Sequence, residues 1–199
     1  SDIGEAHGES FRELVGEHIA CHREWIFENS AIPLDDESLD ATWQPWIAAN
    51  EAVAPALIEE MRGIARGAGV PFEHVFQVNS LLDIGNFRWI DCVRQLVGCT
   101  SFVVPHEAGT NQTLIGQTYD LAFFRRRFNI VLRIRPEDGP SQLVYSLAGI
   151  VGLAGLNQHG LGININYLSS NDCQPGKLHA VIVRQVLAAP NLADAIAAP

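Results

Sequence analysis

The sequence predicts an α+β protein, because its two halves differ in hydrophobic periodicity and in charge. Apolar residues recur every three or four positions up to about residue 84, whereas short β-prone runs separated by turn residues follow residue 98. Residues 1–98 hold 17 Asp and Glu against 6 Lys and Arg, and residues 99–199 hold 6 against 7. We therefore expect two segments, 1–98 and 99–199, with different roles.

The first segment is expected to be helical. An apolar stripe at helical spacing starts near residue 8, and the Pro-containing stretch 32–36 ends it. The next helical region contains Pro45 and Pro55, so it is expected to kink or divide. Gly67 and Gly69 end that region. The expected helices are 8–29, 38–68 and 72–84, the last with Pro71 in its first turn.

The second segment is expected to form short strands and then end in helix. β-branched and aromatic residues gather in five runs, with Gly, Pro, Asn and Asp between them. The expected strands are 99–105, 113–119, 128–134, 142–146 and 162–167. Alanine, leucine and valine then predict helices over 179–189 and 192–198, separated by Pro190.

Composition excludes several classes of function. The net charge of −10 argues against nucleic acid and anionic membranes as partners. No apolar run reaches transmembrane length and no basic, apolar leader opens the sequence, so we expect a cytoplasmic protein outside the membrane. The four cysteines show no CxxC spacing and are expected to be reduced: Cys21, Cys92, Cys99 and Cys173. The sequence leaves the oligomeric state open, a homo-oligomer included.

Cys99 is the strongest candidate for a nucleophile. It follows Gly98 and precedes Thr100 and Ser101, at the point where the chain changes character. Cleavage of the Gly98–Cys99 bond would give Cys99 a free α-amino group, which can accept the proton of its own thiol. Gly98 has no side chain to obstruct attack on its carbonyl carbon. The alternative interpretation is a small buried cysteine that starts a strand.

Other motifs have structural interpretations. His18 and His22 lie four residues apart, but they lack an HExxH glutamate and a third ligand at a usual spacing, so we predict no metal site. The glycines of 149–155 are expected in a strand turn, since no dinucleotide-binding helix follows them. Arg125, in the run 125–127, either receives an anionic substrate group or belongs to an ion-paired surface, and we favour the surface.

Several stretches together resemble one family. They are IGEAHG at 3–8, GCTS at 98–101, GQTYD at 116–120, FFRRR at 123–127 and the Gly- and Asn-rich run 148–167. In order and spacing they resemble the acyl-CoA:6-aminopenicillanate acyltransferase family of N-terminal-nucleophile (Ntn) enzymes, the peptidase C45 group. The resemblance implies a four-layer αββα sandwich preceded by a mainly helical pro-segment. Segment 1–98 would then be the α-chain, and 99–199 the N-terminal part of the β-chain.

The resemblance also implies the roles of individual residues. Cys99 would be the nucleophile that autoproteolysis exposes, and Asp120 would hold its amino group. Asn166 matches the oxyanion-hole position, with Asn164 and Asn157 as rivals, and Asn157 is expected to brace the Asn-x-x-Gly turn. The backbone N–H of Tyr119 is a second oxyanion candidate. Thr100 or Ser101 matches the hydroxyl-bearing positions near the cut.

The function implied is acyl transfer from a small-molecule amide, or from an acyl thioester, through an acyl-Cys99 thioester to water or an amine. No cofactor is expected, although a coenzyme A thioester would serve as co-substrate in an acyl-CoA-dependent N-acyltransferase of the penicillin-biosynthesis type. The alternative outside enzymes is an uncleaved, non-catalytic scaffold or fragment. The family sandwich and its later asparagine and arginine need more chain than 99–199, so we expect a remaining catalytic-domain chain as a partner.

Overall fold

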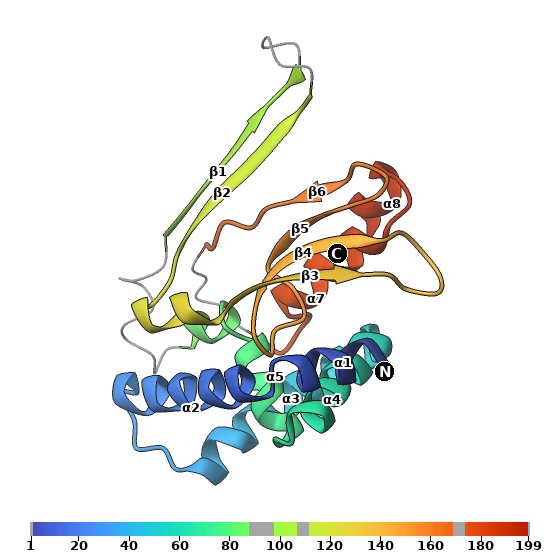
Figure 1. Ribbon diagram of the computed structural model, residues 1–199. Helices are drawn as coiled ribbons and strands as arrows, with labels where there is room; N and C mark the ends of the chain where they lie inside the picture. The colour runs from blue at the N-terminus through green and yellow to red at the C-terminus, as the bar shows by residue number, and fades with distance from the viewer. Residues whose placement is uncertain (1, 88–97, 107–111, 169–173, 199) are drawn as a thin grey trace.

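The computed structural model describes residues 2–87, 98–106, 112–168 and 174–198, and it has a layer of helices beneath an antiparallel sheet, with a long hairpin projecting from one end (Figure 1). The fold is α+β, as predicted. The helical layer consists of α1 (Asp2–Ser10), α2 (Arg12–Asn29), α3 (Asp36–Val53), α4 (Pro55–Ala68) and α5 (Phe72–Asn79), followed by the 3₁₀ helix η1 (Asp83–Asn86). The remaining elements are β1 (Gly98–Val104), β2 (Leu114–Asp120), the 3₁₀ helix η3 (Phe123–Phe128), β3 (Asn129–Ile134), β4 (Gln142–Leu147), β5 (Ala154–Asn157), β6 (Gly162–Ile163), α7 (His179–Ala188) and α8 (Leu192–Ala197).

The helical layer confirms most of the predicted helices and corrects several boundaries; the expected helix 72–84 already ends at Asn79. The expected 38–68 region divides at Pro55, which occupies the first turn of α4, whereas Pro45 lies inside α3. Asp35 caps α3, since its carboxylate accepts a hydrogen bond from Ser38 N–H at 2.8 Å. The expected helix 8–29 is wrong at its start: helix already begins at Asp2 and breaks at Phe11, where φ is −122° and ψ is 26°.

Glycines explain how α1 packs on α4. A Cβ atom on Gly4 would lie 2.0 Å from the Glu60 carbonyl oxygen, and one on Gly8 would lie 2.3 Å from the Ile64 carbonyl oxygen. From the other helix, a Cβ on Gly67 would lie 2.3 Å from the Glu5 carbonyl oxygen. The two backbones therefore touch, and only glycine permits this approach. This contact fixes the opening IGEAHG stretch against the helical layer.

The second segment forms two antiparallel sheets. One is the β1–β2 hairpin, and the other has the strand order β3-β4-β5-β6. Four of the five predicted strands are present, but β6 stops at Ile163, so residues 164–167 of the predicted fifth strand lie outside it. The strand β5 was not predicted, because its sequence AGLN has little β-propensity and is held by pairing with a strand on either side.

Helices cover one face of the four-stranded sheet. Inward-facing Ile134 and Val144 pack against Val183 and Leu187 of α7 and against Ile3 of α1. The opposite face exposes three apolar side chains, Val131 (63%), Leu143 (45%) and Leu156 (48%). One face of the sheet thus packs on helices, and the other exposes apolar side chains to solvent. The solvent-facing side of an antiparallel sheet is usually polar instead.

The two sequence segments share one core. Its buried members range from Val15 in α2 to Val181 in α7. A buried ion pair also joins them: the Arg184 guanidinium of α7 binds both carboxylate oxygens of Glu60 in α4, at 2.5 and 3.0 Å. Arg184 additionally donates to the Gln142 side chain and the Val151 carbonyl oxygen, each at 3.1 Å. Helices of the first segment therefore support strands of the second.

Two general findings concern the described part of the chain. None of its helices is long and apolar enough to cross a membrane. Cys21 and Cys99 are free thiols, as predicted, whereas Cys92 and Cys173 lie outside the described residues.

Candidate functional site

The β1–β2 hairpin brings the predicted catalytic residues together. Its register pairs Gly98 with Asp120 and Cys99 with Tyr119. Because side chains alternate along a strand, Cys99, Ser101, Gln117 and Tyr119 share one face of the hairpin. Thr100 and Asp120 lie on the other face, so of the two hydroxyl residues it is Ser101 that accompanies the thiol.

Asp120 lies against the predicted scissile bond. A Cβ atom built on Gly98 would come within 2.9 Å of Asp120 Oδ2, so the carboxylate covers the Gly98 α-carbon. The Cys99 nitrogen is two covalent bonds away from that α-carbon. Asp120 is therefore positioned for the Cys99 nitrogen rather than for the thiol, which belongs to the opposite face of the ladder.

Tyr119 is the cross-strand neighbour of Cys99. Its hydroxyl donates to the Leu153 carbonyl oxygen at 2.6 Å, and its ring lies 5.7 Å from that of Tyr145. Burial raises the pKa of Tyr119, and negative charge on Cys99 and Tyr145 would raise this pKa further. Tyr119 therefore stays neutral and keeps its donor on Leu153.

Asn166 faces the same side of the hairpin as Cys99. Ser101 Oγ donates to Asn166 Oδ1 at 2.6 Å, while Asn166 Nδ2 has no hydrogen-bond partner among the described residues. A carboxamide with its oxygen occupied and its N–H groups exposed is suited to bind a developing oxyanion. Of the two rivals, Asn164 Nδ2 donates to the Gly116 carbonyl oxygen at 2.9 Å. Asn157 braces the turn as predicted, accepting from the N–H groups of residues 159 and 161 at 3.0 and 3.1 Å.

The favoured interpretation of Arg125 as part of an ion-paired surface is wrong, because this residue of η3 is buried against α2. It is 3% exposed, and its guanidinium donates to His18 Nε2 at 2.9 Å and to His22 Nδ1 at 2.7 Å. The other ring nitrogens bind carbonyl oxygens, so His18 carries its proton on Nδ1, toward Ala148, and His22 carries its proton on Nε2, toward Gln77. Burial, with Arg125 beside them, lowers the pKa of His18 to about 3 and that of His22 well below its usual value.

Arg125 contacts both imidazole rings, which explains why His18 and His22 lie four residues apart on α2. In the described residues no group of three or more His, Cys, Asp or Glu side chains is arranged to hold an ion. Sequence reasoning missed this contact, since α2 and η3 are distant in the chain. Beside it, Arg127 pairs with Glu17 at 3.2 Å and donates to Cys21 Sγ at 3.4 Å, consistent with an ion-paired surface.

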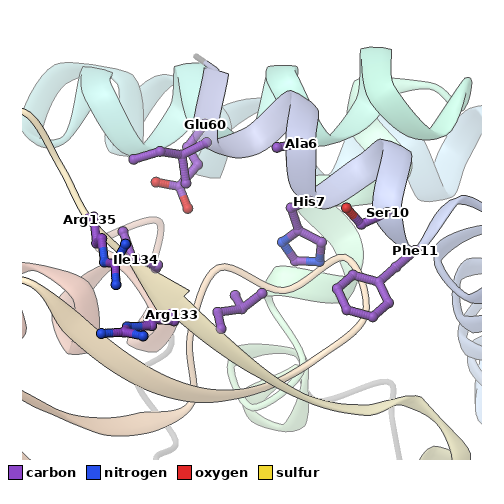
Figure 2. A pocket seen from close by; sticks show the side chains of 10 residues that line it. Ala6, His7, Ser10, Phe11, Glu60, Arg133, Ile134 and Arg135 are labelled. Atoms are coloured by element: carbon purple, nitrogen blue, oxygen red, sulfur yellow. The ribbon is translucent and has the colours of Figure 1, made fainter.

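A separate pocket of about 450 Å³ lies between α1 and β3 (Figure 2). Figure 2 shows His7 descending from α1 toward the strand, with Glu60 entering from α4. His7 Nε2 accepts from the Gly149 N–H at 3.0 Å, and burial lowers the pKa of His7 to about 4. None of the predicted catalytic residues lines this pocket, so it is distinct from the hairpin site.

The C-terminal half of the chain is similar to a known protein family. Residues 107–198 match the family described as acyl-coenzyme A:6-aminopenicillanic acid acyl-transferase. The match supports the family predicted from the sequence motifs; it covers just under half of the chain and includes Asp120 and Asn166 but not Cys99. It indicates an enzyme, either an acyltransferase or a hydrolase. The narrower peptidase C45 assignment stays a prediction.

Proposed function

We propose that this chain is a self-cleaving Ntn enzyme that transfers acyl groups through a Cys99 thioester. The observation that carries the proposal is the geometry of the hairpin. Cys99 and Ser101 share a face, Ser101 binds the oxygen of Asn166, and the Asp120 carboxylate covers the opposite side of Gly98. Acyl transfer requires a nucleophile, an oxyanion donor and a carboxylate that binds the amine, and Cys99, Asn166 and Asp120 are placed for these three roles.

The maturation step breaks the Gly98–Cys99 peptide bond. Cys99 Sγ attacks the Gly98 carbonyl carbon, the C–N bond breaks, and the Cys99 nitrogen takes the proton and becomes an amine. Water then hydrolyses the thioester, which leaves a carboxylate on Gly98 and restores the thiol. The Asp120 carboxylate beside Gly98 stabilises the ammonium that forms.

The catalytic cycle then uses the new amine as its base. The α-amino nitrogen takes the thiol proton, and the thiolate attacks the carbonyl carbon of an amide or a thioester. Asn166 Nδ2 donates to the oxyanion, and the leaving group departs with the proton held by the amine. Water or an amine attacks the acyl thioester and regenerates Cys99. Hydrolysis needs only water in this last step, so we place amide hydrolysis first.

The family sandwich is proposed together with this function. The apolar outer face of the four-stranded sheet, with Val131, Leu143 and Leu156 exposed, supports a second layer packed on it. The αββα arrangement, the assignment of 1–98 as α-chain and 99–199 as part of the β-chain, and a partner chain that completes the site belong to this proposal.

Intact mass spectrometry tests the proposal directly. Wild-type protein should divide between Gly98 and Cys99, whereas Cys99→Ala should stay whole. Incubation with a panel of amides and acyl thioesters should then add an acyl mass to the Cys99 fragment. Product formation that depends on added amine, with release of coenzyme A, would assign the acyltransferase. A wild-type chain that stays whole and takes up no acyl group would support the scaffold instead.

A further inference from the structure

Residues 164–166 are attached to the hairpin by side-chain amides instead of by a strand ladder. The strand β6 ends at Ile163, yet the following residues lie beside β2. Gln117 Nε2 donates to the Ile165 carbonyl oxygen, and the Ile165 N–H donates back to Gln117 Oε1 at 3.0 Å. The Asn164 contact with the Gly116 carbonyl oxygen, at 2.9 Å, adds a third bond.

The paired bonds make Gln117 a substitute for a neighbouring peptide. A primary carboxamide has one acceptor and two donor hydrogens, and here it matches both backbone groups of a single residue. Rotation of the amide by half a turn would face donor with donor and acceptor with acceptor, so the contact fixes one orientation. It therefore fixes the backbone of Ile165, the residue directly before Asn166.

Gln117 stands on the hairpin face that carries the thiol. The register places Gln117 opposite Ser101, and Ser101 is the residue that binds Asn166 Oδ1. One cross-strand pair thus holds Asn166 at two points: Gln117 holds its backbone through Ile165, and Ser101 holds its side-chain oxygen. The remaining group, Asn166 Nδ2, is left to donate elsewhere.

We infer that Gln117 is a positioning residue that holds Asn166 as the oxyanion donor opposite Cys99, an inference that rests on the proposed function. Acylation of Cys99 places charge on a carbonyl oxygen, and a donor displaced by the loss of its support stabilises that charge less. Alkylation of the same thiol develops no oxyanion. The two reactions of one atom therefore separate the positioning role from a general effect on the fold.

The test compares Gln117→Met with wild type and with Gln158→Met. Methionine keeps the length and apolar volume of glutamine but makes neither bond to Ile165. Gln158 is a matched control, since its Oε1 also accepts from a backbone N–H, that of Ser141 at 3.1 Å, away from the hairpin. Cleaved protein is treated with p-nitrophenyl acetate, which acylates Cys99, and separately with iodoacetamide, which alkylates it.

Gln117→Met should slow acylation by about 10²-fold, the usual cost of losing one oxyanion donor, and leave alkylation unchanged. Gln158→Met should leave both rates unchanged. In an Asn166→Ala background, Gln117→Met should cost nothing further, because the group that it positions is gone. Equal loss of acylation and alkylation, unchanged acylation, or additive losses with Asn166→Ala would each overturn the inference.

Hydrogen exchange at Ile165 separates failure of this inference from failure of the proposed function. The Ile165 amide should be protected in wild type and should exchange faster in Gln117→Met, whether or not the enzyme turns over. An unprotected Ile165 amide in wild type overturns the clamp itself. A protected amide in a wild-type protein that shows no acylation of Cys99 overturns the proposed function and, with it, the positioning role.

Discussion

Acidification below neutral pH should destabilise this protein well before its carboxylates titrate. Three buried histidines are held neutral as hydrogen-bond acceptors: His18 and His22 accept from Arg125, and His7 accepts from the Gly149 N–H. A proton on any of these acceptor nitrogens removes the bond. On His18 or His22 it also places a second positive charge against a buried guanidinium.

The sign and the size follow from the lowered pKa values. The pKa is about 4 for His7 and about 3 for His18, and that of His22 is well below its usual value, so each histidine binds a proton more readily after unfolding. The contribution of the neutral histidines to the free energy of unfolding is therefore fully present above the unfolded-state pKa of about 6.5, and it decreases as the pH drops below that value. The lowered pKa values of His7 and His18 each reduce the free energy of unfolding by roughly 2 kcal/mol between about pH 7.5 and pH 5, and His22 acts in the same direction. A typical domain has only about 5–15 kcal/mol in total.

Urea unfolding at several pH values across this range measures the effect. Above pH 5 most carboxylates stay charged, which isolates the histidines, and the reduced self-repulsion of a chain with net charge −10 acts in the opposite direction. The variant His18→Gln should be less stable at pH 7.5 but should lose less of its free energy of unfolding on acidification than wild type does. A free energy of unfolding that is flat or rising from pH 7.5 to 5 would refute the reasoning.

Three further changes have defined outcomes. Gly4→Ala should cost about 1–3 kcal/mol of stability through overpacking against α4 and should therefore lower the melting temperature in a thermal scan. The control Gly16→Ala has open space around the added methyl group and should not lower the melting temperature. Glu60→Ala leaves Arg184 buried without its carboxylate and should cost about 3–5 kcal/mol in urea unfolding, and a loss below 1 kcal/mol would contradict this. Gly98→Ala should displace the Asp120 carboxylate from its place beside the Gly98–Cys99 bond. A gel time course should then show slower cleavage, while the melting temperature stays unchanged.

Local rules predicted the elements whose sequence decides their conformation. Hydrophobic periodicity located the helices, and Pro55 marked the break between α3 and α4. The failures lie where tertiary contacts decide. The strand β5 exists because β4 and β6 pair with it. The break at Phe11 lets α1 and α2 follow different partners, with α1 packed on α4 through glycines that sequence alone does not pair.

The candidate site divides in the same way. Cys99, Asp120 and Asn166 were predictable from motifs, and the hairpin between them from two β-prone runs. The contacts of Gln117 and Arg125 were not, because each side chain binds partners far away in the chain. A signal for Gln117 was nevertheless present: it lies two residues before Tyr119, so in a strand it must share the face of the residue opposite the thiol.

Strand alternation also explains why one short motif serves two purposes. In GQTYD, Gln117 and Tyr119 face the same side of the hairpin as Cys99. Gln117 binds Ile165, the residue before Asn166, and Tyr119 lies opposite Cys99. The fifth residue, Asp120, faces the opposite side and covers Gly98. A hairpin that is one residue out of register would exchange these faces: a shift in one direction would place Asp120 opposite Cys99, and a shift in the other would place Tyr119 opposite Gly98. The chemistry proposed for Cys99 therefore depends on the register of β1 and β2 as much as on the identity of the residues.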